Sequence, residues 1–187
     1  PTYGYLLAFD GKGKLVGLSA EGPLPDWGDD LAISELRADA EQMAELIREL
    51  TTSRPMNLEG VIWYRLPTRD DRLNWPWPTL AAVMEGRSPK QRFEFEARQP
   101  EPGLVEIDLI NRGEADVVLQ PGIRARIEID GATVVASDAV NAFDREKVSD
   151  GVLVFRAPRA SIAPRLGPAR RMTIGWVRLS KKAGVQV

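Results

Sequence analysis

The chain has 187 residues, of which 43% are hydrophobic and 28% charged, so it is long enough to bury the core of one large domain or two small ones. Its 25 basic and 27 acidic residues leave a formal charge of −2, which gives no net field to attract nucleic acid or an anionic membrane. Cysteine and histidine are absent, which excludes disulfides, a Ser-His-Asp triad and most zinc sites within these residues; no cofactor is implied.

Two short apolar runs open the chain. Residues 3–9 and 14–20 are strand-like, and the Asp10-Gly11 between them is a good hairpin signal. The acidic, proline-rich loop that follows is most simply a solvated turn. In the functional alternative, Glu21 ends a strand and its carboxylate faces a sugar or a cation. Glu21 is therefore the single best candidate for a catalytic residue.

Residues 34–52 have the periodicity of an amphipathic helix, with apolar side chains three and four positions apart. Asp39 with Gln42 three residues later resembles a capping box, so the regular part of the helix is expected to begin there. Pro55 prevents the helix from continuing.

A β-branched and aromatic run predicts a buried strand over residues 60–66. A second helix follows, with Pro78 in its first turn and Gly86 at its end. Residues 34–86 therefore have the order helix, strand, helix, which is the rhythm of a parallel α/β sheet.

After Pro89 the pattern changes to alternation of apolar and polar residues, which is typical of antiparallel strands with one buried face. Strands are expected at residues 93–96, 105–109, 117–119, 123–129, 133–136, 152–157 and 172–179. Several short strands about ten residues apart predict an immunoglobulin-like β-sandwich. We therefore expect residues 1–88 to form a first domain and residues 89–187 a β-sandwich accessory domain.

Charged and aromatic side chains gather just after the predicted strand 60–66. Such side chains past the carboxyl end of a buried strand are typical of ligand sites in α/β proteins. Because side chains alternate along a strand, Trp63 and Arg65 share one face and Tyr64 lies on the other. A tryptophan there could stack on a sugar ring, and an arginine could bind a carboxylate. The candidate ligand-binding residues are Trp63, Tyr64, Arg65 and Asp70.

The same residues also have simpler interpretations. Trp63 could be a core residue, and Arg65 could pair with Asp70 or Asp71, since a guanidinium beside a buried strand needs a partner. Two adjacent carboxylates lack the ligand spacing of a calcium loop, so no metal site is predicted. No pair of carboxylates can be assigned as acid and nucleophile for glycoside hydrolysis, and Glu21 alone is half of that mechanism.

The first residue of the chain and its apolar runs give information on where the protein is located in the cell. No apolar run approaches the roughly 20 residues that span a bilayer, so no transmembrane segment is expected. The chain starts at Pro1 without a methionine and enters a strand-like run at once, which indicates a processed product or a fragment of a longer protein. The lack of cysteine suits an extracytoplasmic bacterial protein and many cytosolic ones as well. The compartment stays open, with the periplasm or the extracellular space favoured over the cytoplasm.

Three stretches together resemble a known family: PTYGYLLAFDGKGKLVGLSAEGP, GVIWYRLPTRDDRLNW and PTLAAVMEGRSP. They are similar to the carboxyl-terminal part of an uncharacterised bacterial family, a domain of unknown function with a glycosidase-like (β/α) barrel. The resemblance implies that residues 1–86 are the last strands and helices of a barrel that usually needs about 250 residues. The strands that hold the remaining catalytic acids would then be missing, and this chain alone would be inactive.

The expected fold is thus the C-terminal strands and helices of a (β/α) barrel-like domain followed by an immunoglobulin-like β-sandwich. The expected protein is the C-terminal part of a glycoside-hydrolase-like protein that acts on or binds carbohydrate. Two alternatives stay open. One is a non-catalytic cell-envelope module for binding or assembly, and the other is a small α+β protein that dimerises through open sheet edges. Carbohydrate is the expected ligand and nucleic acid is not, while the oligomeric state does not follow from the sequence.

Overall fold

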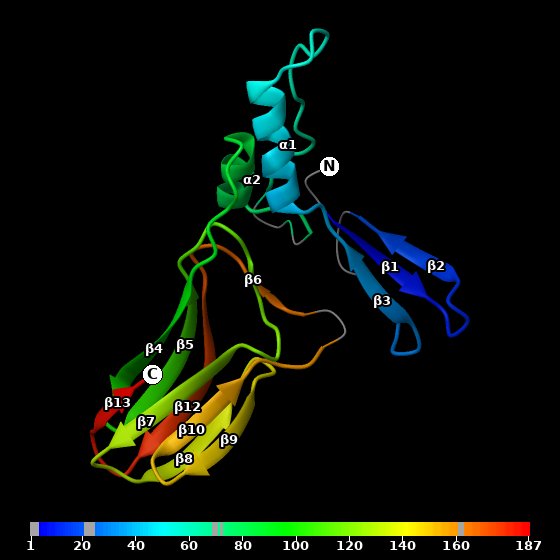
Figure 1. The fold of residues 1–187 in the computed structure, drawn as a ribbon. Coiled ribbons are helices and arrows are strands. Elements are labelled where there is room, and N and C mark those ends of the chain that lie inside the picture. Colours follow the sequence, from blue (N-terminus) through cyan, green and yellow to red (C-terminus); the bar gives the residue numbers. More distant parts are fainter. Residues whose placement is uncertain (1–3, 21–24, 69–70, 72, 161–162) are drawn as a thin grey trace. The chain divides into compact units, whose positions relative to one another are not determined.

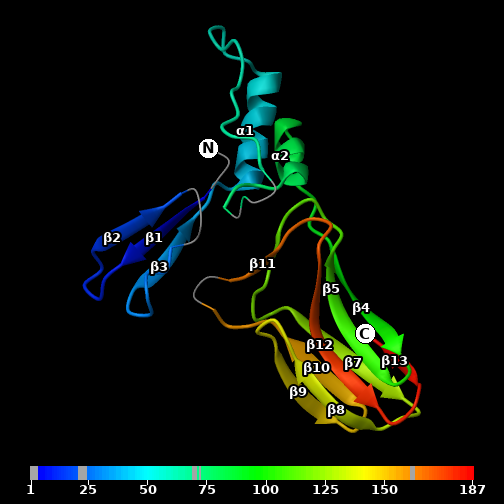
Figure 2. The same cartoon turned by 180° about the vertical axis from the view of Figure 1, so that it is seen from behind.

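The structure is a computed structural model that describes residues 4–20, 25–68, 71, 73–160 and 163–187. The chain divides into two compact units, residues 1–90 and residues 91–187 (Figures 1 and 2). The described residues hold two helices and thirteen strands. Neither helix is long and apolar enough to cross a membrane.

The first unit contains a small antiparallel sheet near its N-terminus. Its strands are β1 (Tyr5–Phe9), β2 (Leu15–Ser19) and β3 (Ala32–Leu36), in the order β2-β1-β3 (Figure 1). β1 and β2 form the hairpin that Asp10-Gly11 predicts, with Leu7 opposite Leu18 and Ala8 opposite Gly17. One face of this hairpin is covered by Trp27, because a Cβ atom on Gly17 would lie 3.0 Å from the Trp27 ring.

Two helices form the rest of the regular structure in this unit. Helix α1 (Ala40–Thr52) starts where the capping pattern predicts, since the Asp39 carboxylate accepts hydrogen bonds from the N–H groups of Glu41 and Gln42. The prediction of helix for residues 34–36 was wrong, because these residues complete β3. The periodicity of the sequence does not show that these residues pair with the edge of β1.

Helix α2 (Trp77–Met84) has Pro78 in its first turn and is followed by Gly86, whose φ of 68° belongs to the left-handed region. A Cβ atom on Gly86 would lie 3.2 Å from the backbone of Arg48, so the two helices approach closely at this point. Their shared core consists of Ala44, Ile47, Trp75, Leu80 and Val83.

The predicted barrel part is wrong. Residues 60–66 belong to none of the four described sheets, and the side chain of Ile62 is 95% exposed. All strand pairs of the described residues are antiparallel, whereas a (β/α) barrel needs parallel strands that alternate with helices. No described strand pairs with this segment.

The second unit is almost entirely β-structure. Its strands are β4 (Phe93–Glu101), β5 (Leu104–Asn111), β6 (Val117–Val118), β7 (Arg124–Asp130), β8 (Val134–Ala139), β9 (Asp144–Ser149), β10 (Val152–Arg156), β11 (Arg165–Leu166), β12 (Arg171–Leu179) and β13 (Gly184–Gln186). They form two four-stranded antiparallel sheets, β4-β5-β12-β8 and β13-β7-β10-β9, and a two-stranded ribbon, β11-β6 (Figure 2).

The two large sheets share one core and so form a two-layered β domain. Ile107 from β5, Ile174 from β12, Ile127 from β7 and Phe155 from β10 are fully buried in it. The immunoglobulin-like topology was nevertheless wrong. That fold places strands A, B, E and D side by side, whereas here β12, the next-to-last described strand, lies beside β5. Alternating hydrophobicity predicts strands but not the order in which they pair.

A network of charged side chains covers the outer face of the sheet β4-β5-β12-β8. Asp108 is fully buried, and its carboxylate accepts hydrogen bonds from Thr173 Oγ1 at 2.7 Å and from Arg171 Nη1 at 3.0 Å. Arg171 also pairs with Glu96 at 2.9 Å. Because the buried charge is paired and hydrogen-bonded on the strand face, the network is accounted for by the fold.

Candidate functional site

The predicted ligand residues of the first unit lie beside the loop before helix α2. Arg65 Nη2 donates to Asp71 Oδ1 at 2.6 Å, and the backbone N–H of Thr68 donates to Asp71 Oδ2 at 2.6 Å. Asn74 is 5% exposed, and its Nδ2 atom donates to the carbonyl of Arg65 at 3.3 Å and to Asp71 Oδ2 at 3.5 Å. Of the two pairings foreseen for Arg65, the structure contains the one with Asp71.

The protonation of Asp71 follows from these contacts. Burial by itself raises the pKa of this carboxyl, but hydrogen bonds from Thr68, Arg65 and Asn74 outweigh it and lower the pKa below the ordinary value. Asp71 is therefore ionised at neutral pH and held by its donors. A general acid needs the opposite condition, a raised pKa, so Asp71 does not have the properties of one.

The three candidates Trp63, Tyr64 and Arg65 lie in different surroundings. Trp63 packs against the core between α1 and α2, and Arg65 forms an ion pair with Asp71. Tyr64 is 60% exposed. Glu21 and Asp70 lie outside the described residues, so the structure does not place the catalytic candidate or the fourth ligand-binding candidate.

Asn74 also leaves one hydrogen-bonding group of the cluster open. Its Oδ1 atom is buried and has no hydrogen-bond partner within the part of the chain that the structure describes. A buried acceptor of this kind is suited to a water or to a ligand hydroxyl. Among the described residues, no group of three acidic side chains could hold a metal ion.

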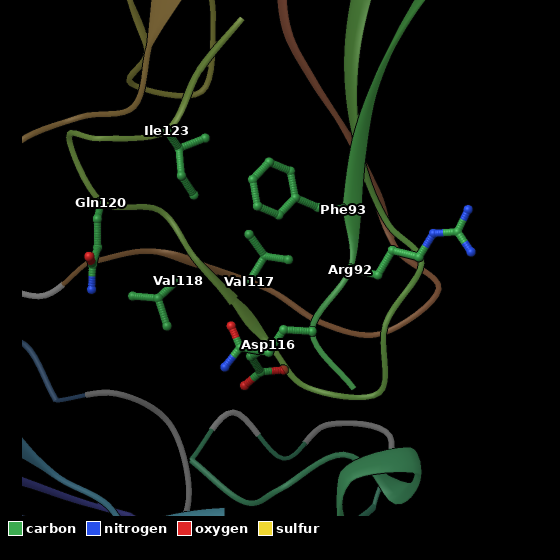
Figure 3. Close-up of a pocket in the computed structure, with 8 residues that line it drawn as sticks. Arg92, Phe93, Asp116, Val117, Val118, Gln120 and Ile123 are labelled. Atoms are coloured by element: carbon green, nitrogen blue, oxygen red, sulfur yellow. The ribbon is translucent and has the colours of Figure 1, made fainter. Parts of the chain in front are cut away.

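A second candidate site is a pocket of about 570 Å³ within the second unit. It is lined by the residues at the start of β4 and by the segment from Asp116 to Ile123 (Figure 3). Phe93 and Ile123 face each other across it, and the carboxylate of Asp116 lies at one end. The guanidinium of Arg92 points away from the other labelled side chains, so the pocket does not present this cation inward.

The wall of this pocket is held in place by Asn111, which is fully buried at the end of β5. Its Nδ2 atom donates to the carbonyls of Ala115 and Leu166, both at 2.8 Å, and its Oδ1 atom accepts from the N–H of Gly113 at 2.8 Å. These bonds fix the turn that leads into β6 and join it to β11. The amide therefore fixes the position of Val117 and Val118, which line the pocket.

The lining gives the pocket a definite chemistry. Phe93, Val117, Val118 and Ile123 form its apolar part, and Gln91, Gln120 and Asp116 supply hydrogen-bonding groups. The sequence did not reveal this site. It predicted a strand at residues 117–119, but the pocket arises because the chain crosses from one sheet to the other there, and such a crossing leaves no pattern in the sequence.

The fold and these sites define a mostly β protein of two units, with a pocket in the second. A family model described as "Domain of unknown function (DUF3142)" matches residues 1–69. This match supports the resemblance of the first unit to an uncharacterised family, and it does not extend to a glycosidase-like barrel. Neither a curated protein nor a solved structure matches the chain.

Proposed function

We propose that the protein is a non-catalytic carbohydrate-binding module whose ligand occupies the pocket of the second unit. The observation that carries this proposal is the pairing of an apolar aromatic wall with amide and carboxylate groups in one cavity. Its volume of about 570 Å³ lies in the range of small-molecule sites. One or two sugar rings match this combination of size and polarity.

Neutral sugars fit the lining better than charged ligands do. Side-chain amides such as those of Gln91 and Gln120 both donate and accept, and a carboxylate accepts from hydroxyl groups. The ring of Phe93 offers a flat apolar surface to the C–H face of a sugar. Arg92 is the one cationic side chain among the described lining residues, and because it points away from the pocket it does not favour a phosphate or a carboxylate ligand there.

Binding is favoured over cleavage because the pocket has one carboxylate among its described lining residues, Asp116. Glycoside hydrolysis requires two carboxyl groups that flank the scissile bond. In the first unit, Tyr64 is our proposed ligand contact, with Trp63 and Arg65 as its structural support. The catalytic role of Glu21 and the ligand-binding role of Asp70 remain predictions.

Titration calorimetry tests the pocket with cello-, xylo-, manno- and chito-hexaose as probes. We expect at least one probe to bind, and Phe93→Ala to weaken its binding about fivefold, since an aromatic contact contributes about 1 kcal/mol. Gln120→Ala, at an exposed position, should weaken the same probe with no change in folding. Val135→Ala on β8, whose side chain is 66% exposed, is the matched control and should leave the affinity unchanged.

Any of three results would contradict this assignment. The first is that none of the four sugars binds, and the second is that Phe93→Ala and Gln120→Ala bind as tightly as the wild type. The third is that Val135→Ala weakens binding as much as they do. Circular dichroism of each variant separates a lost contact from a lost fold. Tyr64→Ala tests the proposed ligand contact of the first unit by itself, in titrations with the same four sugars.

A further inference from the structure

The edge strands of the two units differ in charge. β9, an edge of the second unit, carries Asp144, Arg145, Glu146 and Lys147, and β4, another edge, carries several charged residues and a proline. Charge and proline on an edge strand are the usual protection against pairing with another chain. β2, at the edge of the sheet in the first unit, has the sequence LVGLS and no charged residue. Among the described edge strands of five or more residues, it alone lacks a charge.

The side chains of β2 are also apolar and accessible. Leu15, Val16 and Leu18 are 48%, 52% and 60% exposed. Leu18 lies opposite Leu7 and Leu15 lies opposite Phe9, and directly opposed residues share a face of the sheet. The exposed leucines thus extend an apolar face up to the open edge, where the backbone groups on one side of β2 pair with no other strand that the structure describes.

We propose that β2 pairs antiparallel with β2 of a second copy of the chain, about a twofold axis, to join two three-stranded sheets into one sheet of six strands. A pairing centred on Gly17 sets Val16 of one copy opposite Leu18 of the other. Twofold symmetry makes each contact occur twice, as in most homodimers. This pairing does not involve the pocket of the second unit.

A second copy is the occupant because β2 is complementary to itself. Antiparallel self-pairing brings every residue of the strand opposite another residue of the same strand. In the register of β9 centred on Glu146, Glu146 lies opposite its own copy and Arg145 lies opposite Lys147, and like charges directly opposite are destabilising. In the register of β2 centred on Gly17, Val16 lies opposite Leu18, and no charged residue of the strand lies opposite another.

Sedimentation equilibrium of the full chain over a concentration series up to about 0.1 mM tests the pairing. We expect a concentration-dependent species of twice the chain mass of 20.7 kDa. Leu18→Lys sets a charge on the open edge and should weaken self-association at least tenfold, and Val16→Lys should do the same. Val148→Lys on β9, where the side chain is 51% exposed, is the matched control and should leave self-association unchanged.

A wild-type chain that stays monomeric over the whole series overturns the proposal. So does a dimer that survives both Leu18→Lys and Val16→Lys, or one that Val148→Lys weakens to the same extent. Because both β2 positions are exposed, the lysine variants should keep their fold, which circular dichroism checks. If one of them fails to fold, the other still decides the result.

Discussion

The carboxylate of Asp71 accepts hydrogen bonds from Thr68, Arg65 and Asn74 and is largely buried. Asp71→Asn removes the charge that Arg65 binds and replaces one acceptor oxygen by a donor. We expect the free energy of unfolding to fall by about 2 kcal/mol at pH 7, the scale of a hydrogen bond to a charged group. Urea denaturation followed by circular dichroism measures this change.

The stability difference between the wild type and Asp71→Asn depends on pH, and the direction of this dependence follows from the pKa of Asp71. Because the pKa of Asp71 is lowered in the folded state, the unfolded state takes up the proton first as the pH falls. The stabilisation is complete above about pH 5 and is lost progressively as the pH falls through the folded pKa. The difference between wild type and Asp71→Asn should therefore shrink below about pH 4. A difference that stays constant down to pH 2 would show that Asp71 is not the titrating group.

At the residue level, part of the hydrogen-bonded cluster around Asp71 could be predicted from the sequence. A guanidinium next to an apolar run requires a counter-charge, so pairing of Arg65 with Asp70 or Asp71 followed from local chemistry. Asn74 was not foreseen, because its two contacts depend on how the loop folds back on itself. Phe93 was predicted only as a strand residue, since alternation does not distinguish a core position from a pocket wall.

At the level of elements, strand β12 contains a glycine that the packing requires. A Cβ atom on Gly175 would lie 2.1 Å from Cε1 of Phe155 and 2.9 Å from the carbonyl oxygen of Asp138. Phe155 is fully buried, so it cannot move aside without disturbing the core. We expect Gly175→Ala to destabilise the second unit by about 3 kcal/mol, the upper part of the usual range for overpacking.

Gly184→Ala on β13 is the matched control, because nothing lies within 4 Å of the added atom. It should change the free energy of unfolding by less than about 0.5 kcal/mol. Guanidinium denaturation of both variants gives the comparison. Equal stability of the two variants would mean that Phe155 does not pack against Gly175 as described.

Strand β9 shows why some elements escape prediction from sequence. All six of its residues are exposed, so it has no buried face and no alternation of apolar and polar residues. Its place in the sheet comes from pairing with β10, which does have the apolar pattern. In the opposite case, residues 60–66 have the composition of a strand but no partner in the described sheets. The composition of a segment therefore does not decide whether it pairs in a sheet.

For the whole molecule, the change of pattern after Pro89 correctly indicated a region rich in antiparallel strands. The barrel did not follow from the order helix, strand, helix, because that order is typical of a parallel sheet and does not by itself produce one. Strand direction depends on which strands pair, and β1, β2 and β3 pair antiparallel before helix α1 begins. The order of the strands in both large sheets is likewise a property of long-range packing.

The exposed segment before Pro67 has a consequence for how the chain is cut by proteases. A protease binds its substrate as an extended strand, and exposed segments outside the regular elements are the preferred sites of nicking. Met56 is fully exposed and Ile62 is 95% exposed. In limited digestion with thermolysin, which cuts before bulky apolar residues, we expect the first cut within residues 56–62, located by mass spectrometry. Ile62→Asp should slow that cut, and a first cut in the second unit would contradict the exposure seen here. The segment that looked most like the buried centre of the chain would then be its most readily cleaved peptide.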